Sequence, residues 1–180
     1  SSISCKKIPP MKIVKIFLYI FFVFLFHNIK AQNPPKPIDL PFFNLIEGTW
    51  TAQSDMMGMK MNEELTCAMS LNKQFLVMNL TAVSEDKTHT YTGMGVFGCD
   101  DKGNVTSWWF DHWGVTGTSS GTGKIDGLKM ITDDKSVNYT TNRTLELTGG
   151  QLVMKFSRTV KTPDGKEVPI SGETIYNKTK

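Results

Sequence analysis

From residue 49 onward, two sets of side chains alternate along the chain with a period of two residues. The alternation is clearest in 151–161, where Leu152, Met154, Phe156, Arg158 and Val160 alternate with a mainly polar set. Successive side chains of a β-strand point to opposite faces of a sheet, so this pattern predicts half-buried strands. Strands are expected over 49–56, 60–71, 74–84, 88–99, 104–113, 115–124, 126–132, 135–148, 151–161 and 166–177.

Residues that favour tight turns separate these strands, for example Asn72-Lys73, Asp126-Gly127, Gly149-Gly150 and Pro163-Asp164-Gly165. Turns this short leave no room for crossover helices, so neighbouring strands must be antiparallel. A long antiparallel meander with one apolar face hides its edges best by closing on itself. We therefore expect an all-β protein, an antiparallel up-and-down β-barrel of about ten strands with a short N-terminal helix.

The first 31 residues have the composition of a secretory signal peptide. Two lysines precede an apolar run over 16–26, and Ala31 offers a small residue for cleavage. A membrane-spanning helix needs about 20 apolar residues, so this run is too short to be a good one. Residues 1–10 are expected to lie upstream of the true start at Met11. We expect a periplasmic or secreted protein without a stable membrane anchor after cleavage.

The rest of the chain divides at residue 41. Residues 32–41 hold four of the eight prolines, which predicts an extended linker. Residues 42–180 form the expected barrel domain, opened by a short helix through Phe42, Phe43, Leu45 and Ile46 that Asp39 would cap.

Removal of residues 1–31 changes the charge of the protein. Five of the 20 basic residues and no acidic residue lie in that segment, which leaves 15 basic and 17 acidic residues, a net charge of −2. Nucleic-acid binding requires clustered positive charge, so nucleic acid is not an expected partner.

Two cysteines remain after cleavage, and the expected strand pairing keeps them apart. Cys67 should face Met78, which should face about Met94, and Cys99 lies some five residues further, or roughly 16 Å away. A disulfide needs Cα atoms within about 7 Å, so both thiols are predicted to be free.

Several motifs resemble those of calycin barrels. Gly48-Thr49-Trp50 resembles the Gly-x-Trp start of lipocalins. The segments Gly93–Asp100, Ser107-Trp108-Trp109-Phe110-Asp111 and Gly165–Lys178 look like those of a bacterial calycin-like (lipocalin- and fatty-acid-binding-protein-like) family of uncharacterised exported proteins, with Cys99 where tyrosine is usual. The resemblance implies a barrel whose Trp50 packs across the closed end. It supplies no catalytic residues.

Two arginines are the most informative candidates for a site. Arg143 and Arg158 fall on strand faces otherwise built from apolar and aromatic residues, and the Gly149-Gly150 turn sets Arg143 opposite Phe156. An unpaired buried guanidinium costs several kcal/mol, so each should have a negative partner. That partner is either a ligand carboxylate or phosphate, assisted by Tyr139 or Tyr176 as in the fatty-acid-binding proteins that the chain resembles, or an internal acid such as Glu63 or Asp111. Arginines near the barrel rim that reach water are the third reading.

Aromatic residues crowd the strand at 104–113. Adjacent Trp108 and Trp109 must point to opposite faces, and the expected register places Trp109, Asp111 and Trp113 inside the barrel. Ligand stacking and plain core packing both account for Trp109.

No cofactor or metal is expected. The remaining histidines, His89 and His112, and the two separated cysteines lack zinc-ligand spacing, and no histidine follows His112 for the haem site used by some calycins. Met56–Met61 could bind copper(I), but core filling and a hairpin tip account for these methionines.

Three functions therefore remain open. The first is an exported binding protein for a small hydrophobic or amphipathic ligand, with an anionic group held by the inward arginines. The second is a barrel enzyme of the isomerase or cyclase kind, with Asp111, Glu63 or His112 as acid or base. The third is a fully packed structural envelope protein.

Overall fold

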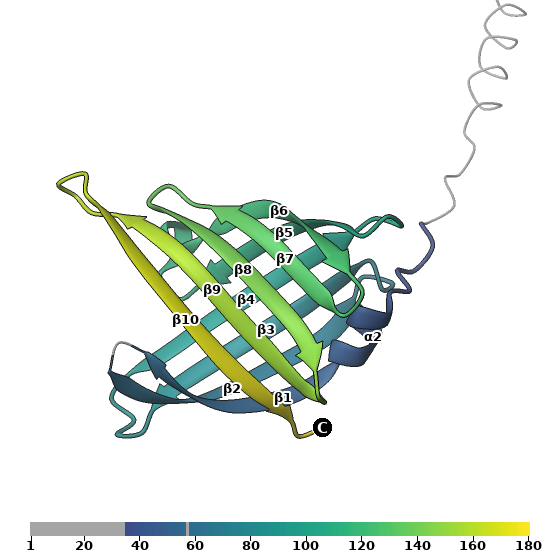
Figure 1. Cartoon of the computed structure of the whole chain (residues 1–180), viewed down its shortest axis with the longest axis horizontal. Coiled ribbons are helices and arrows are strands. Elements are labelled where there is room, and N and C mark those ends of the chain that lie inside the picture. The colour runs from purple at the N-terminus through teal and green to yellow at the C-terminus, as the bar shows by residue number, and fades with distance from the viewer. Residues whose placement is uncertain (1–34, 57) are drawn as a thin grey trace, which may run out of the picture. The chain divides into compact units, whose positions relative to one another are not determined.

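The computed structural model describes residues 35–56 and 58–180, and in them the chain forms one closed β-barrel (Figure 1). Each strand pairs antiparallel with its neighbours in sequence, and β10 pairs with β1. The prediction of an all-β, ten-stranded antiparallel barrel is confirmed. The segment 1–31, expected to be a signal peptide, lies outside the described residues. The strands are β1 (Gly48–Met56), β2 (Met59–Ser70), β3 (Phe75–Ser84), β4 (Thr90–Cys99), β5 (Asn104–Asp111), β6 (Ser119–Asp126), β7 (Lys129–Lys135), β8 (Tyr139–Thr148), β9 (Gln151–Lys161) and β10 (Glu167–Lys178).

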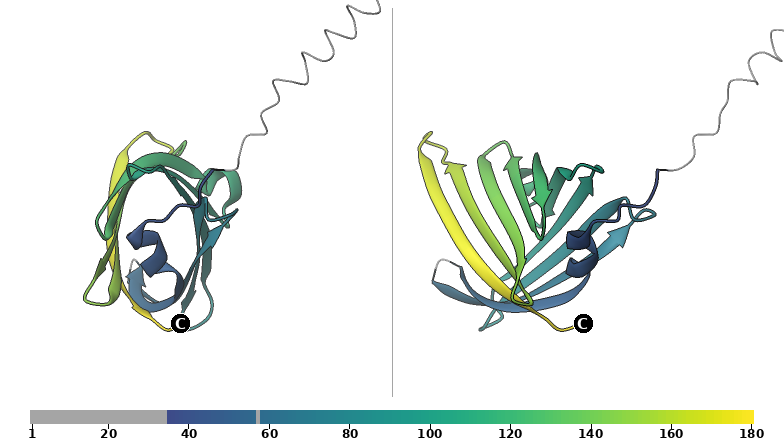
Figure 2. Two further views of the ribbon diagram at one scale, coloured as in Figure 1. Left: turned by 90° about the vertical axis from the view of Figure 1, so that its right-hand side faces the viewer. Right: turned by 45° about the vertical axis from the view of Figure 1, so that its right-hand side comes forward.

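A short helix, α2 (Pro41–Ile46), lies across one end of the barrel, as the end-on view of Figure 2 shows. Proline fits the first turn of a helix because its missing N–H has no partner there in any case. The expected cap is wrong: Leu40 occupies the N-cap position, and the Asp39 carboxylate accepts a hydrogen bond from Asn44 Nδ2 (2.8 Å). The Trp50 indole is buried beneath α2 and donates to the Ile46 carbonyl (2.8 Å), the position that the Gly-x-Trp resemblance implies.

The barrel is packed most densely at the end that α2 covers, which we call the capped end. Its apolar layer contains Phe42, Phe43, Ile46, Leu65, Leu76, Phe97, Met130, Leu145 and Leu152, all fully buried. The hairpins β1–β2, β3–β4, β5–β6, β7–β8 and β9–β10 turn at the opposite end, which we call the open end.

The barrel closes through a short seam between its first and last strands. β1 and β10 share the register pairs Trp50–Lys178 and Thr51–Asn177, whereas β9 and β10 are paired along Glu167–Asn177. Most of β10 therefore has one edge without a strand partner among the described residues. Pro169 lies in this strand, and proline is tolerated in sheets chiefly on such edges.

Several strand boundaries differ from the sequence prediction, and two of these differences bear on the candidate site. β5 ends at Asp111, and residues Gly114–Gly117 form a 3₁₀ turn, η1, so Trp113 leaves the alternating pattern. The prediction that Trp113 points inward is wrong, since 62% of its surface is exposed. β7 continues to Lys135 through Asp133 and Asp134, which lie between the expected strands 126–132 and 135–148.

The cysteine prediction is confirmed. Cys67 faces Met78 as expected, Met78 faces Gly95 rather than Met94, and both Cys67 and Cys99 are free thiols. Burial raises the pKa of Cys67 to about 12.

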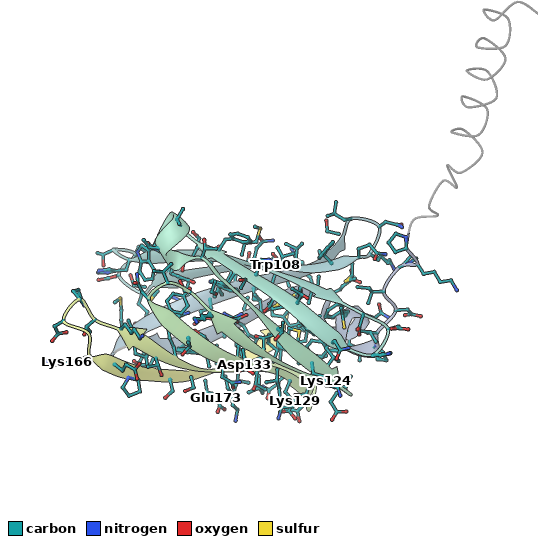
Figure 3. All side chains as sticks on the ribbon, turned by 90° about the horizontal axis from the view of Figure 1, so that it is seen from above. Trp108, Lys124, Lys129, Asp133, Lys166 and Glu173 are labelled. Carbon is teal, nitrogen blue, oxygen red and sulfur yellow. The ribbon has the colours of Figure 1, made fainter. Side chains whose placement is uncertain are left out.

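The outer face of the barrel is polar. Lys124, Lys129, Asp133 and Glu173 project from it in Figure 3, and Lys129 forms a 3.7 Å ion pair with Glu146. Exposed pairs of this kind contribute about 0–1 kcal/mol to stability. Within residues 35–56 and 58–180, no helix has both the length and the apolar character needed to cross a membrane.

Candidate functional site

The two candidate arginines lie on adjacent strands and point into the barrel. Arg143 on β8 faces Phe156 on β9, as expected, and Arg158 faces Thr141. Arg143 is only 5% exposed, and Arg158 is half-buried. The side-chain parity predicted from the Gly149-Gly150 turn is therefore correct, and the two guanidinium groups are diagonal neighbours on one inner face.

Arg143 has an internal counter-ion that the sequence reasoning missed. Its Nη1 lies 3.3 Å from Oδ2 of Asp134, which is 3% exposed. Asp134 also accepts hydrogen bonds from the hydroxyls of Ser107 and Thr132 (3.2 Å for Thr132). The inward alternation Met130, Thr132, Asp134 could have revealed this partner if the expected strand had not ended at residue 132.

The ion pair leaves one donor of Arg143 unused. Nη1 is buried and has no hydrogen-bond partner among the described residues, because its contact with Asp134 lacks hydrogen-bond geometry. Burial lowers the pKa of Arg143, while Asp134 raises it and the nearby charge of Arg158 lowers it further. A buried donor without an acceptor costs about 1–3 kcal/mol.

Arg158 differs from Arg143 because no described carboxylate lies within 4.0 Å of it. Its Nε donates to Thr141 Oγ1 (3.0 Å), and its guanidinium carbon lies 4.2 Å from the centre of the Tyr139 ring. These contacts fix the plane of the guanidinium and leave its two terminal nitrogens without a protein acceptor in the described part of the chain.

Trp109 points inward, as predicted, and its ring lies flat against β4. A Cβ on Gly93 would come within 2.6 Å of the indole, so only glycine allows this close approach. The Arg143 guanidinium stacks 4.5 Å above the Trp109 ring. Trp109 Nε1 donates to the Tyr91 hydroxyl (3.0 Å), and burial raises the pKa of Tyr91 to about 12.

Tyr139 and Asp111 are held by the β5–β6 loop. The Tyr139 hydroxyl donates to the Gly117 carbonyl (2.7 Å), so only the ring of Tyr139 faces Arg158. Asp111 is half-buried and accepts the Trp113 backbone N–H (3.0 Å), with the Tyr91 hydroxyl 3.5 Å from its other oxygen.

Tyr176 lies in a separate polar cluster. Its hydroxyl donates to one carboxylate oxygen of Glu63, and the Ser54 hydroxyl donates to the other. Glu63 is 6% exposed and has no ion-pair partner among the residues that the structure describes. Burial and the neighbouring Glu63 charge raise the pKa of Tyr176. The structure therefore brings Arg143, Arg158, Tyr139 and Trp109 together and places Tyr176 with Glu63.

Along β9 and β10, exposure of the inward side chains rises from the capped end to the open end, whereas Met61, Ser84 and Asp134 stay buried near the open end of their own strands. Leu152 of β9 is fully buried, whereas Phe156 and Val160, further along the same inward face, are half-buried, as is Ile170 of β10. Inward side chains can reach water only through the barrel interior or the β1–β10 seam. The inner face of β9 and β10 around Arg158 is therefore incompletely covered.

An open depression of about 900 Å³ lies on the outer side of the seam. It is lined mainly by polar residues of β1, β2, β3 and β10, including Thr51, Gln53, Asn62 and Asn177. Of the candidate residues named from the sequence, Glu63 lines it and neither arginine does, so it is distinct from the arginine cluster.

The candidate acids and bases do not form one group. Glu63 contacts Ser54, Asp111 contacts the β5–β6 loop, and His112 is exposed, with Nδ1 accepting the Thr92 backbone N–H (3.1 Å). No described cluster of three histidine, cysteine or acidic residues could hold a metal ion.

The fold is shared with a protein of known structure. Neither a protein-family model nor a curated protein sequence matches the chain. A solved structure described as the crystal structure of Rv2717c from M. tuberculosis is similar, with 12% sequence identity and a TM-score of 0.55. The match covers 79% of this chain and 100% of the other. At this identity the likeness concerns the ten-stranded barrel fold alone.

Proposed function

We propose that the protein binds a small, mostly apolar ligand whose anionic group pairs with Arg158 inside the open half of the barrel. The observation that carries this proposal is the half-buried Arg158 guanidinium, which lies on an inner face without a carboxylate partner in the described residues. A charged group shielded from water is stabilised by pairing, and a planar guanidinium binds a carboxylate or phosphate through two parallel hydrogen bonds.

The surroundings of Arg158 support an amphipathic ligand. Phe156, Val160 and Ile170 provide apolar surface beside it, and their partial exposure leaves that surface available for contact. Trp109 and the Tyr139 ring hold the two guanidiniums in place by stacking.

The proposal also includes the family of the protein and its export. The Gly48-Thr49-Trp50 start and the packing of Trp50 under α2 support membership of the calycin-like family of exported proteins. Export to the periplasm or the exterior, with cleavage after Ala31, would be seen in the intact mass of the protein recovered from its native compartment.

Two dyes that differ in charge test the role of Arg158. Anilinonaphthalene sulfonate is anionic and phenylnaphthylamine is neutral, and both fluoresce when bound in an apolar site. Hydrogen bonds to a charged group contribute about 1.5–3 kcal/mol, so we expect Arg158→Met to weaken binding of the sulfonate dye by roughly 10- to 100-fold. Binding of the neutral dye should be unchanged.

Lys161→Met is the matched control, because Lys161 is an exposed cation on the same strand. It should leave both dyes unchanged. Equal weakening of both dyes by Arg158→Met, or no change in either, would contradict the proposal, as would failure of the native protein to bind either dye.

A further inference from the structure

The positive charge of Arg143 is compensated by a neighbouring carboxylate, whereas the positive charge of Arg158 is not. Arg143 is paired with Asp134 at 3.3 Å, and both side chains are buried, so this pair is neutral as a unit. Arg158 has no carboxylate within 4.0 Å among the described residues. The cluster therefore presents one uncompensated positive charge to a ligand and not two.

A second negative charge on a ligand would add to the negative charge of the other inward carboxylates, Asp111 and Glu63. These carboxylates accept hydrogen bonds from the Trp113 backbone N–H and from hydroxyls, and none of these donors carries a full positive charge. A dianionic head group at Arg158 would leave one of its charges unmatched, in a region partly shielded from water where Asp134 lies two strands away. An unmatched buried charge is disfavoured by several kcal/mol.

We propose that the barrel selects head groups with a single negative charge, and that Asp134 is the residue that determines this selectivity by neutralising Arg143. The proposal rests on the binding function proposed above. Asp134 is a positioning and charge-setting residue, since it contacts Arg143, Ser107 and Thr132 and not the ligand.

Decyl sulfate and decyl phosphate test the selectivity, because they share chain length and tetrahedral shape and differ in charge. At pH 8 the phosphate is a dianion, since the second pKa of a phosphate monoester is about 6. Isothermal titration with the full chain, below the micelle concentration of both compounds, should give at least about tenfold tighter binding of the sulfate. As the pH falls to 5, binding of the phosphate should approach that of the sulfate.

Two variants connect this preference to Asp134. Asp134→Asn keeps the size of the side chain and removes its negative charge, which leaves the charge of Arg143 uncompensated, so the preference should fall below twofold or reverse. In the double variant Arg143→Met/Asp134→Asn the neutral pair is removed as a unit, and the preference for the sulfate should be retained. If Asp134→Asn does not fold, the double variant and the pH series still decide the question.

The outcomes separate this inference from the proposed function. Native protein that binds neither compound would overturn the proposed function. Native protein that binds both equally, or the phosphate more tightly, would overturn the charge selectivity and leave the binding function standing. An unchanged preference in folded Asp134→Asn, or its loss in the double variant, would overturn the role of Asp134.

Discussion

Replacing Arg143 by methionine should destabilise the barrel by about 3–5 kcal/mol, because it leaves a buried carboxylate without its cation. Asp134 would keep its hydrogen bonds from Ser107 and Thr132, and these do not supply a compensating charge. For a domain of this size such a loss lowers the melting temperature by roughly 6–20 °C. Urea unfolding followed by far-ultraviolet circular dichroism measures the change without relying on Trp109 fluorescence.

The double variant Arg143→Met/Asp134→Asn gives the sharper result. Burial lowers the pKa of Arg143 despite the attraction of Asp134, so desolvation opposes the ion pair. We therefore expect the double variant to recover most of the loss, to within about 2 kcal/mol of the native protein, as other buried pairs do when both partners are replaced. Lys129→Met, which breaks an exposed pair, should cost less than about 0.5 kcal/mol. A double variant as unstable as Arg143→Met would refute the reasoning, as would a loss below about 1 kcal/mol in the single variant.

Gly95→Ala should cost about 1–3 kcal/mol in urea unfolding, since its Cβ would lie 2.7 Å from the Phe97 ring and 3.0 Å from the Trp109 ring, and an unchanged midpoint would contradict this packing. The Cys67 thiol, whose pKa is raised from 9.0 to about 12, stays protonated in the folded state, so its contribution to stability is present below pH 9 and is lost as the pH rises to about 12. Cys67→Ala should therefore reduce the fall of the urea midpoint over that pH interval, and an unchanged slope would argue against it. Tyr139→Phe should cost about 1 kcal/mol through its lost bond to the β5–β6 loop, and hydrogen exchange should rise in that loop and not in β9.

The sequence predicted the barrel because period-two alternation survives in almost every strand. It also predicted which way Arg143, Arg158 and Trp109 point, since the double-glycine turn sets the register of β8 and β9 and a shift of one residue would reverse every side chain. The same reasoning failed for Trp113, where the strand ends at Asp111 and the alternation no longer applies.

The partner of Arg143 was harder to predict. Strand pairing relates residues that are neighbours across a ladder, and β7 pairs with β8 so that Arg143 faces Thr132 and lies diagonal to Asp134. Two consecutive aspartates usually favour a turn, because their side chains bond to nearby backbone groups. Here Asp133 points outward and Asp134 inward, and the buried charge is stabilised by contacts from β5 and β8 that no local pattern contains.

The arrangement of small and large inward residues argues against a barrel whose interior serves packing alone. At the capped end, Phe42 and Phe43 of α2 are fully buried in the apolar core, so the chain can build a dense core. Above Tyr176, the inward positions of β10 are Thr174, Gly172 and Ile170, and the Phe156 ring lies over Gly172 and remains half-exposed. Each Å² of apolar surface left in contact with water forgoes about 25 cal/mol, which larger inward side chains on β10 would recover. Apolar surface left uncovered beside an uncompensated guanidinium is accounted for if a ligand covers both, and binding would then stabilise the folded barrel in proportion to the logarithm of ligand concentration.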